Sequence, residues 1–256
     1  MEQTAKNLLV FNKVAKITVL FWVMKIIATT LGETLGDLLA HTLNLGYTIG
    51  LIITGIFFII TLFIQLKARK FSPTLYWLVI AGTTTVGTEI SDFMDRTLNL
   101  GYLAGSIILI TLLLSTLIIW KKRIGKIEVY PISRKNVELF YWIAILFSNS
   151  LGTAFGDYLS DNAGFSYLEG ALITAAVIVV VVLLHYISKI NSMILFWLAF
   201  VFTRPFGATF GDLLTKTSAE GGFDLGTVPA TIVCILLLSG LVFFSHKNQV
   251  AQKLIS

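Results

Sequence analysis

Apolar residues gather in stretches of about 20, the length that a helix needs to cross the hydrocarbon core of a bilayer. Eight such stretches follow one another along the chain, and short polar segments separate them. They lie near residues 14–38, 48–66, 75–94, 103–120, 137–158, 167–187, 192–214 and 226–245. The pattern predicts an all-α integral membrane protein, with eight transmembrane helices in one transmembrane domain of residues 1–256.

The chain repeats one unit four times. Each unit has a tryptophan, a glycine ten residues later and an aspartate fifteen residues later. The tryptophans are Trp22, Trp77, Trp142 and Trp197, and the aspartates are Asp37, Asp92, Asp157 and Asp212. The units span approximately residues 12–66, 72–122, 136–188 and 191–247. Each unit is therefore expected to contain two helices, an A helix with the tryptophan and the aspartate, and a B helix that follows after a short loop.

Because every unit contributes two spans, all four should share one orientation, as in transporters built of parallel repeats. A longer basic linker, residues 121–135, separates two pseudo-symmetric halves, residues 1–120 and 135–247. Four tandem two-helix repeats, each with a tryptophan, resemble a bacterial membrane-protein family that is defined as a repeat of unknown function. The resemblance covers essentially the whole chain. It implies an eight-helix protein of the bacterial inner membrane and implies no activity.

Composition and charge agree with a membrane location. Hydrophobic residues make up 56% of the 256 residues and charged residues only 13%, about half the charged share of a soluble domain. The net charge of +5 does not indicate a nucleic-acid partner, because fifteen of the nineteen Lys and Arg residues fall in the termini and in three loops on one side of the predicted bundle. This positive-inside distribution predicts that both termini are cytoplasmic. The lipid bilayer is then the main partner, and the oligomeric state stays open.

The repeated tryptophans and glycines have structural explanations. Each tryptophan lies about two turns into its A helix, at the depth where aromatic rings anchor helices at the membrane interface. Small residues four apart follow it, a spacing that lets membrane helices pack closely. The glycines of these pairs are Gly32, Gly36, Gly87, Gly152, Gly156, Gly207 and Gly211. Close packing of the four A helices would gather the residues that follow each pair.

Carboxylates follow the glycines. A charged side chain costs about 3 kcal/mol at the centre of a bilayer and less near its surface, so a single Asp could simply mark a solvated helix end. Four at one register argue for a shared site. Glu33 and Glu89 lie three or four residues before an aspartate, and we expect them on the same helix face. Lys25 and Arg204 are interpreted as internal counter-ions.

Other polar residues occur at a matching depth, although many hydroxyls in membrane helices only bond to neighbouring helices. The predicted ion-binding residues are Glu33, Asp37, Glu89, Asp92, Asp157, Asp212, Thr29, Thr84 and Asn149, with the four aspartates as metal ligands. An oxygen-only set favours Mg²⁺, Ca²⁺ or Mn²⁺ over Cu(I) or Zn²⁺. No resident cofactor is expected, and a divalent cation would be a substrate. His41 and its counterparts Arg96, Asp161 and Lys216 are interpreted as solvated loop residues.

These features favour a transporter of a small cation, with proton coupling as an option because protons can also neutralise buried carboxylates. Three alternatives stay open: a passive cation channel with an acidic ring, a transporter of a small organic cation, and a scaffold without flux. An enzyme is not expected, because the sequence has no zinc-protease motif, no phosphate-binding loop and no Ser–His pair at a common depth.

Overall fold

The computed structural model describes residues 12–255, with side chains up to Lys247, and this part of the chain forms eight long helices. Lys6, which counts toward the predicted basic side, lies outside the described residues. The A helices are α2 (Val19–Asp37), α4 (Pro73–Asp92), α6 (Lys135–Asp157) and α8 (Ser192–Thr215). The B helices are α3 (Gly46–Lys67), α5 (Gly101–Ile124), α7 (Tyr167–Ile187) and α9 (Thr227–Ile255). The predicted all-helical fold of four two-helix units is confirmed.

Seven of the eight helices in residues 12–255 are long and apolar enough to cross a membrane. α4 falls short of that hydropathy although it has 20 residues, because a run of threonines at 83–85 and two carboxylates interrupt its apolar pattern. Protein covers these groups, since α4 lies against α2, α3 and α6. The helices are those of a multi-pass membrane protein.

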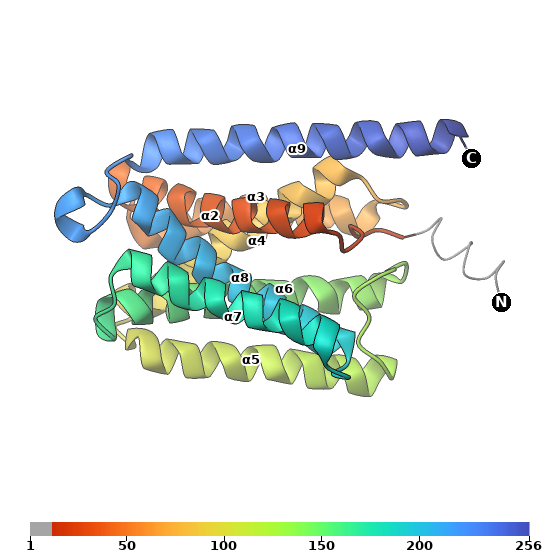
Figure 1. Cartoon of the computed structure of the whole chain (residues 1–256), viewed down its shortest axis with the longest axis horizontal. Coiled ribbons are helices and arrows are strands. Elements are labelled where there is room, and N and C mark those ends of the chain that lie inside the picture. The colour runs from red at the N-terminus through yellow and green to blue at the C-terminus, as the bar shows by residue number, and fades with distance from the viewer. Residues whose placement is uncertain (1–11, 256) are drawn as a thin grey trace.

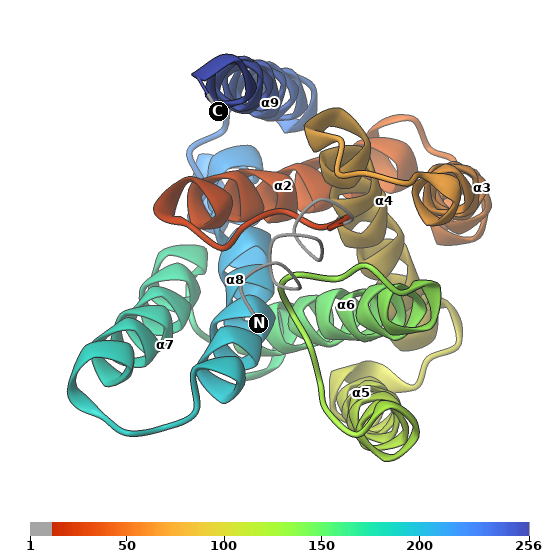
Figure 2. The ribbon, with the colours of Figure 1, turned by 90° about the vertical axis from the view of Figure 1, so that its right-hand side faces the viewer.

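The four A helices form a ring. α2 contacts α4 and α8, and α6 contacts the same two helices, so the order around the ring is α2, α4, α6, α8. Figure 2 looks along the bundle and shows these helices around the centre, with α3, α5, α7 and α9 at the periphery. Figure 1 shows the same helices from the side, with long axes running from one end of the molecule to the other.

Each B helix packs on the A helix of the next repeat. α3 lies against α4, α5 against α6, and α7 against α8. α9 closes the circle, because it lies against α2, the A helix of the first repeat (Figure 2). The repeats are therefore interlocked, and none of them forms a compact unit with its own two helices.

Glycines hold the ring of A helices together at one register. A Cβ added at Gly32 would lie 2.6 Å from the Cβ of Thr84 on the next helix, and one at Gly207 would lie 2.5 Å from the Cβ of Thr29. Gly87 and Gly152 make the equivalent approach to the two remaining neighbours. Four residues later, Gly36, Gly156 and Gly211 also face the next A helix. The small-residue spacing thus brings neighbouring A helices to near backbone contact.

Three A helices end in a wide π-helical turn directly after their aspartate: η1 (Leu38–Thr42), η2 (Phe93–Thr97) and η3 (Tyr158–Asn162). Such turns are rare and are frequent at functional sites. In the first two repeats Asn44 and Asn99 then adopt left-handed backbone angles, with φ of 52° and 54°, as asparagine tolerates. Repeat 4 differs, with the single 3₁₀ turn η4 (Ser218–Glu220) in its longer loop.

The tryptophans are part of an internal aromatic cluster. Trp77, Trp142 and Trp197 are 3%, 0% and 7% exposed, and only Trp22 is half-buried. They pack edge to face with Tyr76, Tyr141 and other rings of the A helices, a favourable aromatic geometry. The interpretation of the tryptophans as anchors at the lipid surface is therefore wrong for Trp77 and Trp142.

We call the end of the bundle with the four aspartates the acidic end, and the end with the loops at 68–72, 125–134 and 188–191 the basic end. At the basic end the segment that precedes α2 is tied across the ring. Lys13 Nζ contacts a carboxylate oxygen of Glu138 and donates to the carbonyl of Leu66, and the Lys13 amide donates to the carbonyl of Ile132 at 2.9 Å. Lys13 and Glu138 are almost completely buried. This segment and the aromatic cluster fill the bundle at its basic end.

Candidate cation-binding site

The four aspartates converge. Asp37, Asp92 and Asp157 are the last residues of α2, α4 and α6, and Asp212 lies in the last turn of α8. All four line one pocket of about 450 Å³ at the acidic end, and each is less than 10% exposed. The glycine pairs explain this convergence, because they bring the A helices close together one turn before the carboxylates.

Carboxylates outnumber cationic groups around this acidic pocket. Its lining residues include seven carboxylates but only two permanently charged bases, Arg96 and Lys216. Glu33, Asp161 and Glu220 are the three carboxylates besides the aspartates of the A helices. One oxygen each of Asp92 and Asp212 is buried without a hydrogen-bond partner among the described residues. These two oxygens instead face the Arg96 and Lys216 side chains at 3.3–3.4 Å. The pocket therefore has an excess of carboxylates over cationic side chains, which favours a cation.

Residues four positions after each aspartate form the rim of the pocket. His41, Arg96 and Asp161 are exposed, as their interpretation as solvated residues expects, and Lys216 is half-buried. All four also line the pocket, which that interpretation did not include. Lys216 Nζ lies 2.9 Å from Asp37 and 3.4 Å from Asp212. Arg96 reaches Asp92, Asp157 and Asp161 at 3.3–3.4 Å. The spacing of four residues after an aspartate was the sequence signal for this rim, because it places two side chains on one helix face.

Three carboxylates are close enough to share one ion. One oxygen from each of Glu33, Asp37 and Asp212 lies within 4.8 Å of the other two. The Lys216 ammonium bonds to two of these three groups. Burial lowers the pKa of Lys216, but the charges of Asp212 and Asp37 outweigh this and raise the pKa above its ordinary value. Lys216 is therefore a built-in cation next to the place where a bound cation would sit.

Arg96 is held by rings as well as by carboxylates. Its guanidinium carbon lies 5.9 Å from the ring centre of Tyr47 and 5.6 Å from that of Tyr102, within the range of cation–π attraction. Tyr102 donates a hydrogen bond of 2.6 Å to Asp161. The first three repeats thus surround a guanidinium with aromatic faces and carboxylates.

Arg204 pairs with Glu33 at the floor of the pocket, which agrees with its interpretation as a counter-ion. Its Nη2 lies 2.8 Å from Glu33 and also contacts the hydroxyl of Thr88 on α4, across the ring from α8. Arg204 is completely buried and Glu33 is 4% exposed. Buried charges of this kind need a partner, because leaving either one unpaired costs several kcal/mol.

Lys25 differs from its interpretation as a counter-ion. Its ammonium donates to Asn149 Oδ1 at 2.9 Å and lies 4.1 Å from the ring centre of Phe200. No carboxylate lies within ion-pair distance of it among residues 12–255. Lys25 on α2 and Asn149 on α6 meet across the ring, so this pair fills the bundle axis below Arg204.

The remaining predicted ligands serve helix packing. Thr84 donates to the carbonyl of Ala28 at 2.9 Å, and Thr29 donates to that of Thr203 at 3.1 Å. Asn149 is occupied by Lys25 and by Thr83. None of Thr29, Thr84 and Asn149 lines the acidic pocket. The prediction of these three residues as ligands does not agree with their positions.

Glu89 also points elsewhere. It does not line the pocket, and its carboxylate lies against α3, where a Cβ added at Gly50 would come within 2.6 Å of its Oε1. Both carboxylate oxygens are buried without a hydrogen-bond partner among the described residues. Glu33 lies four residues before its aspartate and Glu89 three, which rotates them about 40° and 60° to opposite sides of the aspartate. Only Glu33 therefore faces the pocket.

Comparison with known proteins gives a family and no function. A family model described as Repeat of Unknown Function (DUF347) matches four segments, residues 20–71, 75–124, 140–191 and 195–250. These segments coincide with the four two-helix units and together cover most of the chain. No curated protein and no solved structure matches the chain.

Proposed function

The chain belongs to the family Repeat of Unknown Function, and since that description gives no activity, we propose from the pocket that the protein transports a small cation across the membrane. The observation that supports the proposal most directly is the convergence of four aspartates, one from each repeat, in one pocket with an excess of carboxylates. A scaffold has no use for carboxylates gathered at this cost.

A hard divalent metal ion is the proposed substrate. Glu33, Asp37 and Asp212 offer three carboxylate oxygens within 4.8 Å of one another, and carboxylate oxygens are the ligands that Mg²⁺, Ca²⁺ and Mn²⁺ prefer. Lys216 contacts two of these groups. Binding of the ion then means that its charge replaces that of the Lys216 ammonium, which moves away from Asp37 and Asp212 toward solvent.

A carrier agrees better with the filled axis than an open channel. Below the pocket, Arg204, Lys25, Tyr76, Tyr141 and Trp142 are all completely or almost completely buried within the bundle. A cation that enters at the acidic end would reach the other side only after these groups move, as in alternating access. The basic side chains at the opposite end make that end cytoplasmic under the positive-inside rule, so the pocket would open to the outside.

An organic cation is the second candidate, favoured by one observation. Arg96 already places a guanidinium between the rings of Tyr47 and Tyr102 and beside three carboxylates. Aromatic rings with carboxylates recognise organic cations. A substrate of this class would take the place of the Arg96 side chain.

Flux into liposomes tests the proposal. The purified chain is reconstituted with a metal-sensitive dye inside the vesicles, and Mn²⁺ entry is compared between the wild type and Asp37→Asn or Asp212→Asn. Each substitution removes one carboxylate of the triad, so we expect entry to slow about tenfold or more. Asp224→Asn is the matched control, because Asp224 is exposed at the acidic end and does not line the pocket.

Three outcomes separate the alternatives. Saturable entry that is lost in Asp37→Asn and kept in Asp224→Asn supports a carrier. Entry that does not saturate and appears as single-channel current identifies a channel instead. If wild-type vesicles admit no Mn²⁺ but take up a guanidinium or quaternary ammonium compound, the organic cation is the substrate. No uptake of either class contradicts the proposal.

A further inference from the structure

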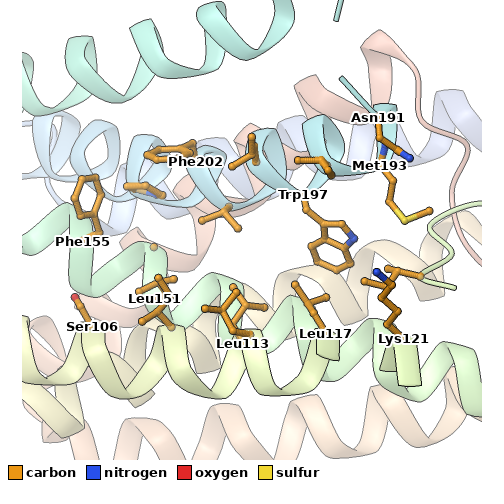
Figure 3. Close-up of a pocket in the computed structure, with 18 of the residues that line it drawn as sticks. Ser106, Leu113, Leu117, Lys121, Leu151, Phe155, Asn191, Met193, Trp197 and Phe202 are labelled. Atoms are coloured by element: carbon orange, nitrogen blue, oxygen red, sulfur yellow. The ribbon is translucent and has the colours of Figure 1, made fainter. Parts of the chain in front are cut away.

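A second and larger cavity lies on the side of the bundle and shares no lining residue with the acidic pocket. It is a groove of about 930 Å³ between α5 and α8, and residues of α6 form its floor. Figure 3 shows Leu113, Leu117 and Trp197 projecting into it from opposite walls. Almost all of its lining is aliphatic or aromatic, and its rim is open, with Leu114 and Ile194 51% and 55% exposed.

The groove opens toward the lipid bilayer. α5 is a peripheral helix (Figure 2), and the groove opens beside it. On α8 the lining runs from Asn191 to Pro205, which is about 20 Å at a rise of 1.5 Å per residue. One leaflet contributes about 15 Å of hydrocarbon. The groove therefore has the length of one leaflet, with some length left at the basic end for a headgroup.

The mouth of the groove at the basic end carries positive charge. Lys121 and Lys126 line it, and none of the lining residues is Asp or Glu. Lys126, which is exposed, also contacts the half-buried Glu128 at 3.1 Å, and an ion pair with so much solvent access contributes little. The first turn of α8, a helix of 24 residues, begins at Ser192 beside the same mouth. Asn191 caps the Met193 amide, and the Ile194 amide donates to the Asn191 carbonyl, so it is the positive end of the helix dipole that favours an anion there.

Trp197 provides an independent sign of a ligand. Its side chain is 7% exposed, and its indole N–H has no hydrogen-bond partner among the described residues. The indoles of Trp120 and Trp142 lack a partner as well, but of these three only Trp197 lines the groove. Figure 3 shows the ring inside the groove between Met193 and Leu117, with its nitrogen on the side of Lys121. Trp197 lies six residues from Asn191, or about 9 Å deeper along the helix. A buried N–H donor normally finds an acceptor. Because helical side chains point back toward the N-terminus, the indole lies less deep than its Cα, on the side where the ester carbonyls of a phospholipid follow the phosphate.

We propose that this groove binds one anionic phospholipid of the leaflet at the basic end. The acyl chain lies between α5 and α8, an ester carbonyl accepts from Trp197, and Lys121 and the N-terminus of α8 hold the phosphate. The site is independent of the acidic pocket. The bound lipid would hold α5 of the second repeat against α8 of the fourth, the helix that carries Arg204.

Native mass spectrometry of the full chain in detergent tests the site with two lipids that have the same chains, palmitoyl-oleoyl phosphatidylglycerol and palmitoyl-oleoyl phosphatidylcholine. We expect one tightly retained phosphatidylglycerol per chain. Lys121→Gln should weaken its retention about fivefold, the usual contribution of one lysine near anionic lipid. Lys122→Gln, the neighbouring residue that does not line the groove, should change retention by less than about twofold.

Two further variants address the groove itself. Leu114→Trp fills it from its exposed rim and should displace both lipids, while its melting temperature without lipid should match that of the wild type because Leu114 is half exposed. Trp197→Phe removes the donor and should weaken both lipids equally. Equal retention of the two lipids by the wild type, equal loss in Lys121→Gln and Lys122→Gln, or a lipid-free dimer seated on this face would overturn the proposal.

Discussion

Replacement of Lys216 should change cation binding and leave the fold intact. Its ammonium neutralises Asp37 and Asp212, and it stands after the last residue of α8 with 28% of its side chain exposed. Lys216→Gln should therefore leave the helix intact and remove one competing charge. We expect Mn²⁺ to bind about tenfold more tightly in calorimetric titrations, a gain limited by solvent screening.

A cation that binds elsewhere would not respond in this way. Lys189→Gln removes an equal charge from an exposed residue at the basic end and serves as the control, with an expected change close to zero. Unchanged or weaker Mn²⁺ binding in Lys216→Gln would show that the triad of Glu33, Asp37 and Asp212 is not the binding site.

Sequence reasoning reached the aspartates because four copies of one residue at one register stand out. It missed Lys216 and Arg96, since their counterparts in the other repeats are His41 and Asp161 and no residue type recurs. It also grouped Glu33 with Glu89, which only the direction of each side chain separates. Side-chain direction depends on helix rotation within the bundle, and spacing along one helix does not determine that rotation.

At the scale of the helix, the close contacts at the glycines predict a loss of stability when a glycine is replaced. Gly32→Ala places a methyl group 2.6 Å from the Cβ of Thr84, and the backbones must move apart to accept it. We expect a loss of about 1–3 kcal/mol of stability, seen as a lower melting temperature in detergent. Gly55→Ala and Gly240→Ala are matched controls inside α3 and α9, because nothing lies within 4 Å of either added Cβ.

Equal melting temperatures for Gly32→Ala and the two controls would contradict the close approach of α2 and α4.

The number and order of the helices followed from apolar length and repeats alone. The π-helical turns after three of the aspartates did not, because the hydrogen bonds that widen the last turn, such as the one from the Leu43 amide to the carbonyl of Leu38 at 2.9 Å, leave no mark in hydrophobic spacing.

At the scale of the whole molecule, the interlocked repeats hold the two halves together. α5 belongs to the first half but packs on α6, and α9 belongs to the second half but packs on α2. A chain divided after Gly125 should therefore reassemble, and we expect the co-expressed fragments 1–125 and 126–256 to co-purify through a tag on either one. Most of the contacts between the two fragments are made by helices inside the bundle, and they do not depend on the covalent linker.

Removing residues 227–256 from the second fragment deletes α9 and its contact with α2. We expect this shorter fragment to recover at least about twofold less of its partner. Fragments that purify separately as single species would show instead that each half closes on itself.

α9 is synthesised after the other long helices of residues 12–255 and covers α2, the first of them. Until α9 leaves the translocon, one flank of α2 has no permanent neighbour, and neither Glu33 nor Asp37 can reach Arg204 and Lys216 before α8 and its following loop are made. Nascent α2 must therefore wait in lipid or beside the insertion machinery with its charges uncompensated. A chain that stops before α8 would therefore keep Glu33 and Asp37 without Arg204 and Lys216 as partners.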